Sequence, residues 1–170
     1  MKNRPINYKR FVMISLFTSF AIILGYVEFL IPVNIGIYGF KLGLSNIATV
    51  IVLCSMGFIP ALFVLVVRIV TVNLLFGSIF ALIFSLAAGL CSLLVMWILK
   101  KVFKCHPIFF SGIGGVTHNI VQLIVASVLL GSTAIMYLFP PLLVLGVITG
   151  VLVGYIAKLV LNRIEKYIPR

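Results

Sequence analysis

Long apolar stretches, broken by short polar or glycine-containing segments, make up most of the chain. They cover residues 11–31, 44–75, 78–99, 108–130 and 140–161. The second stretch is long enough for two short helices, because Gly57 suits the end of one helix and Pro60 suits the first turn of the next. Backbone amides in lipid must be paired within their own segment, so stretches of about 20 apolar residues are typical of membrane-spanning helices. The pattern therefore predicts an all-α integral membrane protein with six transmembrane helices.

Composition excludes a water-soluble domain. Hydrophobic residues make up 64% of the 170 residues and charged residues only 9%, whereas about a quarter of the residues in a soluble domain are charged. The first apolar stretch is too long for a signal peptide and is not followed by a small-residue cleavage site. We therefore expect a single transmembrane domain over residues 1–170.

The distribution of cations predicts the orientation in the membrane. Three basic clusters precede the first span, follow the fourth span and close the chain. Their members are Lys2, Arg4, Lys9, Arg10, Lys100, Lys101, Lys104, Lys158, Arg163, Lys166 and Arg170. Of the 13 lysines and arginines, only Lys41 and Arg68 lie elsewhere. With six spans, the positive-inside rule places segments 1–10, 100–107 and 162–170 in the cytoplasm and the loop 32–43 outside. The pI of about 10.0 then reflects topology and contact with anionic lipid rather than binding of nucleic acid.

Besides Lys158 of the last basic cluster, two charged residues lie inside predicted spans. A guanidinium such as that of Arg68 costs about 2.5–3.5 kcal/mol at the centre of a membrane helix, so it must face protein, water or a ligand. Glu28, near the outer end of the first span, needs a cation, and Lys41 and Arg68 are the candidates. Arg68 either bonds to Glu28 or to carbonyls at a helix end, or it contacts an anionic or polar ligand.

The fifth span is the most polar. His118, Asn119 and Gln122 fall within about 100° of one another on a helical wheel, which favours either hydrogen bonds between helices or the wall of a cavity. Asn46, at the start of the second span, suits either a helix cap, together with Ser45, or a cavity.

Small residues mark two further helix surfaces. Gly146, Gly150 and Gly154 form a doubled Gly-x-x-x-Gly in the sixth span, which is a specific signal for close helix packing. The first span carries Ala21 and Gly25 on a stripe of small residues, which suits either packing within the bundle or docking of a partner helix.

Catalytic and metal-binding motifs are absent from the sequence. The chain has two acidic residues, Glu28 and Glu165, and no aspartate, so it lacks paired carboxylates for acid–base catalysis or for magnesium. No cysteine–histidine spacing fits a metal site, and the three cysteines are expected to be free thiols. We therefore expect neither an enzyme nor a cofactor.

Several motifs together carry a family resemblance. They are KLGLSN at 41–46, Arg68 followed by LFG at 75–77, FSLAAG at 84–89, GVTHNIVQ at 115–122, and YLFP at 137–140 followed by Gly146, Thr149 and Gly150. This combination resembles the Gx transporter family, also labelled heptaprenyl diphosphate synthase component I. That family is similar to the substrate-binding S components of energy-coupling factor transporters. The chain departs from the family pattern at two places. Position 88 is an alanine where a second glycine is expected, and the first span has Ala21-x-x-x-Gly25 in place of a pair of alanines.

The resemblance implies an S-component-like bundle in the bacterial plasma membrane. It implies binding of a small, polar or anionic, vitamin-like compound, with energy from a separate transmembrane T component and two cytoplasmic ATPases. The residues expected to contact the substrate are Lys41, Asn46, Arg68, His118, Asn119 and Gln122. The face of Ala21 and Gly25 is expected to dock the partner. The alternative is a non-catalytic membrane scaffold, or an accessory subunit of isoprenoid or redox machinery, in which the polar residues only join helices.

Overall fold

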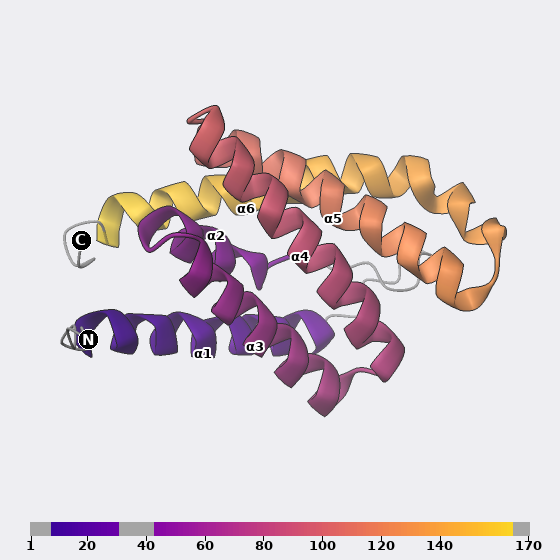
Figure 1. Ribbon diagram of the computed structural model, residues 1–170, viewed down its shortest axis with the longest axis horizontal. Coiled ribbons are helices and arrows are strands. Elements are labelled where there is room, and N and C mark those ends of the chain that lie inside the picture. Colours follow the sequence, from indigo (N-terminus) through magenta and orange to yellow (C-terminus); the bar gives the residue numbers. More distant parts are fainter. Residues whose placement is uncertain (1–7, 31–42, 165–170) are drawn as a thin grey trace, which may run out of the picture.

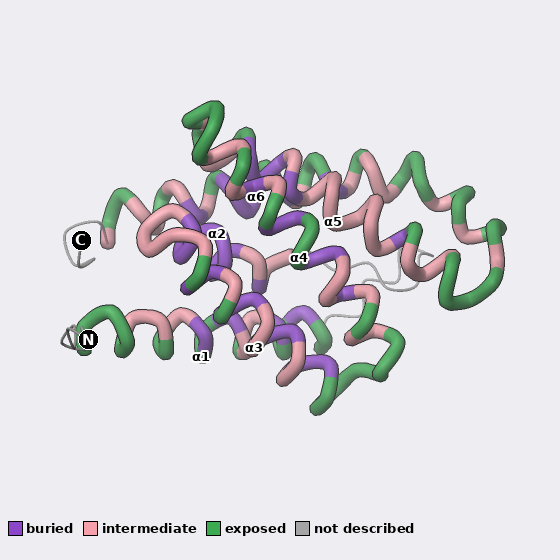
Figure 2. Tube along the Cα trace, viewed as in Figure 1, coloured by how far each residue is buried: buried purple, intermediate pink, exposed green. Residues whose placement is uncertain are grey.

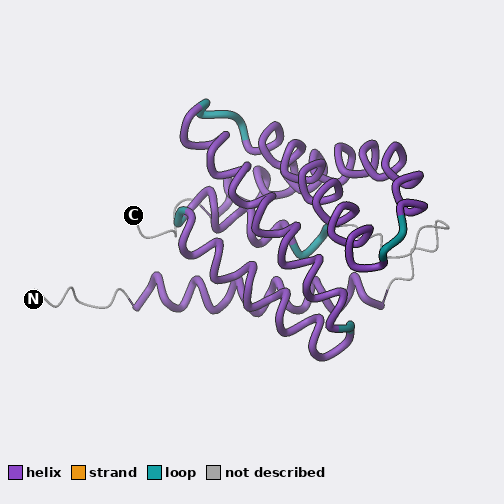
Figure 3. The backbone as a smooth tube through the Cα atoms, turned by 45° about the vertical axis from the view of Figure 1, so that its right-hand side comes forward, coloured by secondary structure: helices purple, strands orange, loops and turns teal. Residues whose placement is uncertain are grey.

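The computed structural model describes residues 8–30 and 43–164, and this part of the chain forms helices joined by short connections (Figures 1 and 3). The elements in chain order are α1 (Tyr8–Leu30), α2 (Asn46–Ser55), α3 (Phe58–Phe76), α4 (Ile79–Val102), α5 (Pro107–Leu130), the 3₁₀ helix η1 (Thr133–Leu138) and α6 (Phe139–Ile164). The prediction of an all-α fold with six helices is thereby confirmed, and η1 occupies the connection that leads into the last helix.

Helix length separates α2 from the rest. Helices α1, α3, α4, α5 and the segment Thr133–Ile164 are long and apolar enough to cross a membrane, so the chain is a multi-pass membrane protein. The expectation of two short helices over 44–75 is wrong for α3, which has 19 residues. It holds for α2, whose 10 residues extend about 15 Å, roughly half of the hydrocarbon core.

Three chain segments rich in cations meet at one end of the bundle, which we call the basic end. The start of α1 and the ends of α4 and α6 lie there (Figure 1). Arg10 donates a hydrogen bond to the carbonyl of Met56 (3.1 Å), and Lys100 donates to those of Leu53 (2.6 Å) and Cys54 (3.0 Å). These carbonyls lie at the end of α2, where the last carbonyl oxygens of a helix have no intrahelical N–H donor. Two cations thus cap α2 at the basic end.

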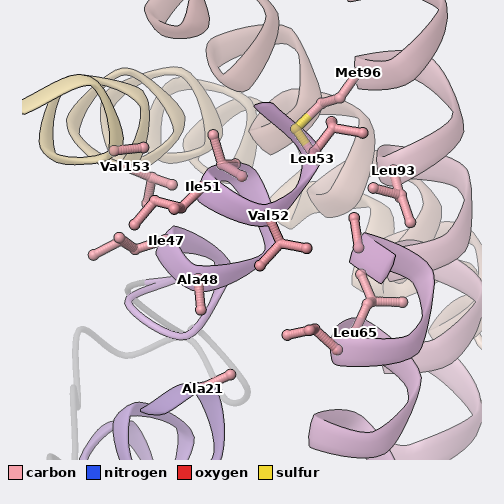
Figure 4. Close-up of a cluster of buried hydrophobic side chains, with 14 of the residues drawn as sticks. Ala21, Ile47, Ala48, Ile51, Val52, Leu53, Leu65, Leu93, Met96 and Val153 are labelled. Atoms are coloured by element: carbon pink, nitrogen blue, oxygen red, sulfur yellow. The ribbon is translucent and has the colours of Figure 1, made fainter. Parts of the chain in front are cut away.

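Helix α2 lies at the centre of the core (Figures 2 and 4). Every residue from Ile47 to Leu53 is buried, which is expected of a helix that is apolar all round. Figure 4 shows the surrounding side chains, which come from α1 (Ala21), α3 (Leu65), α4 (Leu93 and Met96) and α6 (Val153). The longer helices therefore pack around a short central one. Gly57 permits the sharp reversal into α3, because its φ of 94° favours glycine.

Helices α5 and α6 approach each other through glycines. A Cβ atom built on Gly150 would lie 2.5 Å from the carbonyl oxygen of Ser111, and one on Gly154 would lie 2.7 Å from the Cα atom of Ile108. A Cβ on Gly146 would lie 2.9 Å from the carbonyl oxygen of Gly115. The doubled Gly-x-x-x-Gly therefore lies at the contact between α5 and α6 within the monomer.

The small residues of α1 also face inward, as the alternative of packing within the bundle predicts. Ala21 has no exposed surface and belongs to the core. Gly25 is buried, and a Cβ atom on it would lie 2.9 Å from Cγ2 of Val72 on α3. The small side chains let α1 approach α2 and α3 closely, and a docking role for this face stays a prediction.

Candidate functional site

A cavity of about 150 Å³ lies where α2 begins. Its walls come from α1, the first turn of α2, α3, α4, α5, η1 and α6. Its polar lining residues are Glu28, Ser45, Asn46, Arg68, Ser85, His118, Asn119, Gln122 and Thr149. Its apolar lining residues include Ile69, Val72, Phe84, Leu123, Ala126, Ile135, Leu138 and Leu142. The cavity reaches the middle of α3, because its lining residue Arg68 is the eleventh of the 19 residues of that helix.

Glu28 binds the start of α2. One of its carboxylate oxygens accepts a hydrogen bond from the amide of Leu44 (3.0 Å). The other accepts from the amide (3.4 Å) and the hydroxyl (2.7 Å) of Ser45. Amides at a helix start have no intrahelical acceptor and carry partial positive charge, so a carboxylate is a suitable partner. Glu28 thus holds the beginning of α2 from the neighbouring helix α1.

Arg68 joins the same network from α3. Its Nη1 donates to the hydroxyl of Ser45, and its Nη2 donates to Oδ1 of Asn46 (3.0 Å). The Ser45 hydroxyl therefore lies between the two buried charges, since it donates to Glu28 and accepts from Arg68. Arg68 is only 6% exposed, and within the described part of the chain its Nε finds no acceptor.

The local backbone explains why Ser45 is available for this role. Gly43, with φ of 74°, starts a turn in which the amide of Asn46 donates to the carbonyl of Gly43 (2.9 Å). Ser45 occupies the N-cap position, but its own side chain accepts no capping hydrogen bond from α2. Sequence analysis gave Ser45 or Asn46 as the cap. The structure shows instead that Glu28 accepts from the amides that precede α2, while the side chains of Ser45 and Asn46 accept from Arg68.

Helix α5 supplies a wall of uncharged polar groups. His118, Asn119 and Gln122 are half-buried and line the cavity. The amide of Asn119 donates to the carbonyl of Leu142 in the first turns of α6 (2.8 Å). Gln122 makes no hydrogen bond with any other described residue, so its amide is available to a molecule in the cavity.

The structure brings together five of the six residues predicted to contact a substrate. Asn46, Arg68, His118, Asn119 and Gln122 all line the cavity, although they come from α2, α3 and α5. Lys41, with most of the loop 32–43, lies outside the described residues. Asn46 and Arg68 also bond to each other. This bond differs from the cap considered for Asn46 and from the bond to Glu28 or to helix-end carbonyls considered for Arg68.

Sequence analysis did not assign several lining residues to the site. Glu28 was expected to find a cation, and its link to Arg68 through Ser45 meets that expectation only indirectly. Ser85 and Thr149 gave no signal beyond small-residue packing, because single hydroxyls are common in membrane helices. The apolar residues of the cavity are indistinguishable in sequence from residues that face lipid.

Residues 8–30 and 43–164 contain no candidate metal-binding site. These segments hold no group of three or more histidine, cysteine or acidic side chains that could bind an ion. Cys54, Cys91 and Cys105 are free thiols.

Comparison with known families decides the affiliation of the chain. The sequence model for heptaprenyl diphosphate synthase component I matches residues 17–160. The chain belongs to this family. The matched region runs from α1 into α6 and includes every residue that lines the cavity. Neither the curated proteins nor the solved structures give a significant match to the chain.

Proposed function

We propose that this member of the heptaprenyl diphosphate synthase component I family is a membrane-embedded substrate-binding subunit. Its role resembles that of the S components of energy-coupling factor transporters. It takes up a small, polar or anionic, vitamin-like compound across the bacterial plasma membrane. A separate T component and cytoplasmic ATPases supply the energy, because the sequence has no phosphate-binding loop of the form Gly-x-x-x-x-Gly-Lys-[Ser/Thr].

One observation carries the proposal. Polar residues from α1, α2, α3 and α5 converge on one cavity, around the point inside the bundle where the short helix α2 begins. Helix ends and ionisable groups at membrane depth are expensive unless they line a cavity or a substrate pathway. Ligand pockets are mostly apolar with a few convergent polar groups, and this cavity has that character.

A catalytic role has little support in the residues. A prenyl synthase holds diphosphate through magnesium and carboxylates, whereas this chain has two acidic residues in total. The one in the described residues, Glu28, is engaged by the amides of Leu44 and Ser45. The word synthase in the family name therefore fits an accessory component better than a catalyst.

A second candidate, a membrane scaffold or accessory subunit, is favoured by a different observation. Several polar groups of the cavity bond to the protein itself: Arg68 to Ser45 and Asn46, and Asn119 to the carbonyl of Leu142. In a scaffold, these polar residues would serve only to join the helices. The two functions differ in whether the cavity is occupied when the protein is extracted from its membrane.

Native mass spectrometry after gentle extraction separates the two candidates. The binding subunit should retain a small molecule, and the variant Gln122→Leu should retain about tenfold less, because a hydrogen bond to the ligand is lost. Asn162→Leu is the matched control, since this amide is exposed on α6. An empty cavity, together with purification of a stable enzyme partner in place of ATPases, would favour the scaffold.

The role of Arg68 needs its own test. Arg68→Ala should weaken ligand retention and lower the yield of folded protein, because Glu28 loses its countercharge. Arg163→Ala, at an exposed position of α6, should change neither. Unchanged retention and unchanged yield in Arg68→Ala would remove Arg68 from the site.

A further inference from the structure

The carboxylate and the guanidinium of the cavity wall offset each other. Among the described lining residues, Glu28 supplies the carboxylate and Arg68 supplies the guanidinium. They carry opposite charges and are joined through the Ser45 hydroxyl. The cationic character expected from Arg68 alone is therefore offset by a carboxylate of the same wall.

Both charges are also committed to protein groups. The carboxylate of Glu28 accepts three hydrogen bonds at the start of α2, and both terminal nitrogens of Arg68 are engaged by Ser45 and Asn46. Glu28 is 9% exposed and Arg68 is 6% exposed. An anion that reached Arg68 would compete with Glu28, and one of the two negative charges would be left without a partner at membrane depth.

The more exposed polar groups of the wall are side-chain amides and an imidazole of α5. His118, Asn119 and Gln122 are more exposed than the charged pair and lie on neighbouring turns of α5. The amides of Asn119 and Gln122 offer both donors and acceptors, and that of Gln122 has no partner among the described residues. This surface fits a neutral carbonyl, amide or heteroaromatic nitrogen better than a carboxylate or a phosphate.

Apolar side chains provide the rest of the wall. Val72 and Phe84 contribute from α3 and α4, and the others come from α5, η1 and α6: Leu123, Ala126, Ile135 and Leu142. The cavity has a volume of about 150 Å³, well above the space that a single water molecule needs. The space suits a compact molecule with one polar edge and one apolar edge.

We propose that the substrate is a small amphiphilic molecule with no net charge, which presents a hydrogen-bonding edge to the α5 amides and an apolar edge to α4, η1 and α6. This inference rests on the proposed binding function and narrows it from polar or anionic compounds to neutral ones. Glu28 acts here as a positioning residue. It neutralises Arg68 and holds Asn46 in the cavity wall by fixing the start of α2.

Identification of the retained molecule tests the inference. The protein is extracted in a mild detergent, denatured, and the released compounds are analysed by mass spectrometry in both polarities. The inference predicts a compound that is neutral at pH 7 and present in about equal amount to the protein. It also predicts about tenfold less of this compound in Gln122→Leu and an unchanged amount in Asn162→Leu.

The possible failures are distinguishable. An organic anion or phosphate ester released in stoichiometric amount overturns the neutral-substrate inference and leaves the binding function standing. A protein that carries no small molecule overturns the binding function and the inference together. A neutral compound that is retained equally by the wild type and by Gln122→Leu overturns the assignment of the α5 wall.

Discussion

At the scale of single residues, the central feature is a pair of opposite charges separated by a hydroxyl. Sequence reasoning required a partner for a buried guanidinium and a partner for a buried carboxylate, and it paired them as one option. It did not indicate Ser45 as the group between them, because a serine before a helix normally caps that helix. In the structure, Glu28 performs the capping, and Ser45 is free to connect it to Arg68.

Removal of this carboxylate should be strongly destabilising. Glu28→Ala leaves the Arg68 charge buried without compensation and two amides at the start of α2 without an acceptor. We expect the free energy of unfolding to fall by about 3–5 kcal/mol, measured by thermal or denaturant unfolding in detergent. Ser15→Ala, at an exposed position of the same helix, should change it by less than about 0.5 kcal/mol. Equal stability of the two variants would contradict the network.

At the scale of helices, the short central helix α2 depends on its neighbours at both ends. Glu28 of α1 binds its first amides, while Arg10 of α1 and Lys100 of α4 bind its last carbonyls. A helix of 10 residues is marginal by itself, since helices this short owe their stability to packing and capping. The lysine at the end of α4 therefore has a structural function besides its contribution to topology.

The cap at the end of α2 can be tested with two adjacent lysines. Lys100→Met removes the donor to the carbonyls of Leu53 and Cys54 and should lower the free energy of unfolding by about 1–3 kcal/mol. Lys101→Met removes the same charge from an exposed side chain that lies over the ring of Trp97. This control should have a clearly smaller effect. A larger effect at Lys101 would mean that charge alone, and not capping, matters here.

The contact between α5 and α6 can be tested with two glycines of that interface. Gly150→Ala places a Cβ atom 2.5 Å from the backbone oxygen of Ser111, so the helices must separate. We expect it to lower the free energy of unfolding by about 1–3 kcal/mol. Gly112→Ala meets only the side chain of Val151 at 3.3 Å and should be tolerated. Similar melting temperatures for the two variants would argue against the close approach.

At the scale of the whole molecule, the basic end makes the two ends of the bundle different in charge. The start of α1 and the ends of α4 and α6 lie together (Figure 1), as the span count and the cation clusters jointly predict. The cytoplasmic location of this end stays a prediction from the positive-inside rule.

Reporter fusions test this orientation. A fluorescent protein fused to either terminus should fold and fluoresce in the bacterial cytoplasm, and alkaline phosphatase at the same positions should be inactive. Alkaline phosphatase inserted after Gly131, in the connection between α5 and η1, should be active, because that connection lies at the opposite end of the bundle (Figure 1). Activity at a terminus would reverse the topology.

The sequence by itself determined the membrane class, the number of helices, the clustering of cations and the family. These properties depend on composition, on the length of apolar runs and on motif spacing, all of which are local. It also identified Arg68 and the polar triplet of α5, since polar groups inside apolar runs are conspicuous. Only the tertiary structure decided that α2 is central, that Gly25 packs against Val72 inside the monomer, and that Glu28 offsets Arg68. Those facts depend on the rotation and depth of each helix relative to the others, and helical periodicity within one segment does not say which neighbour each face meets.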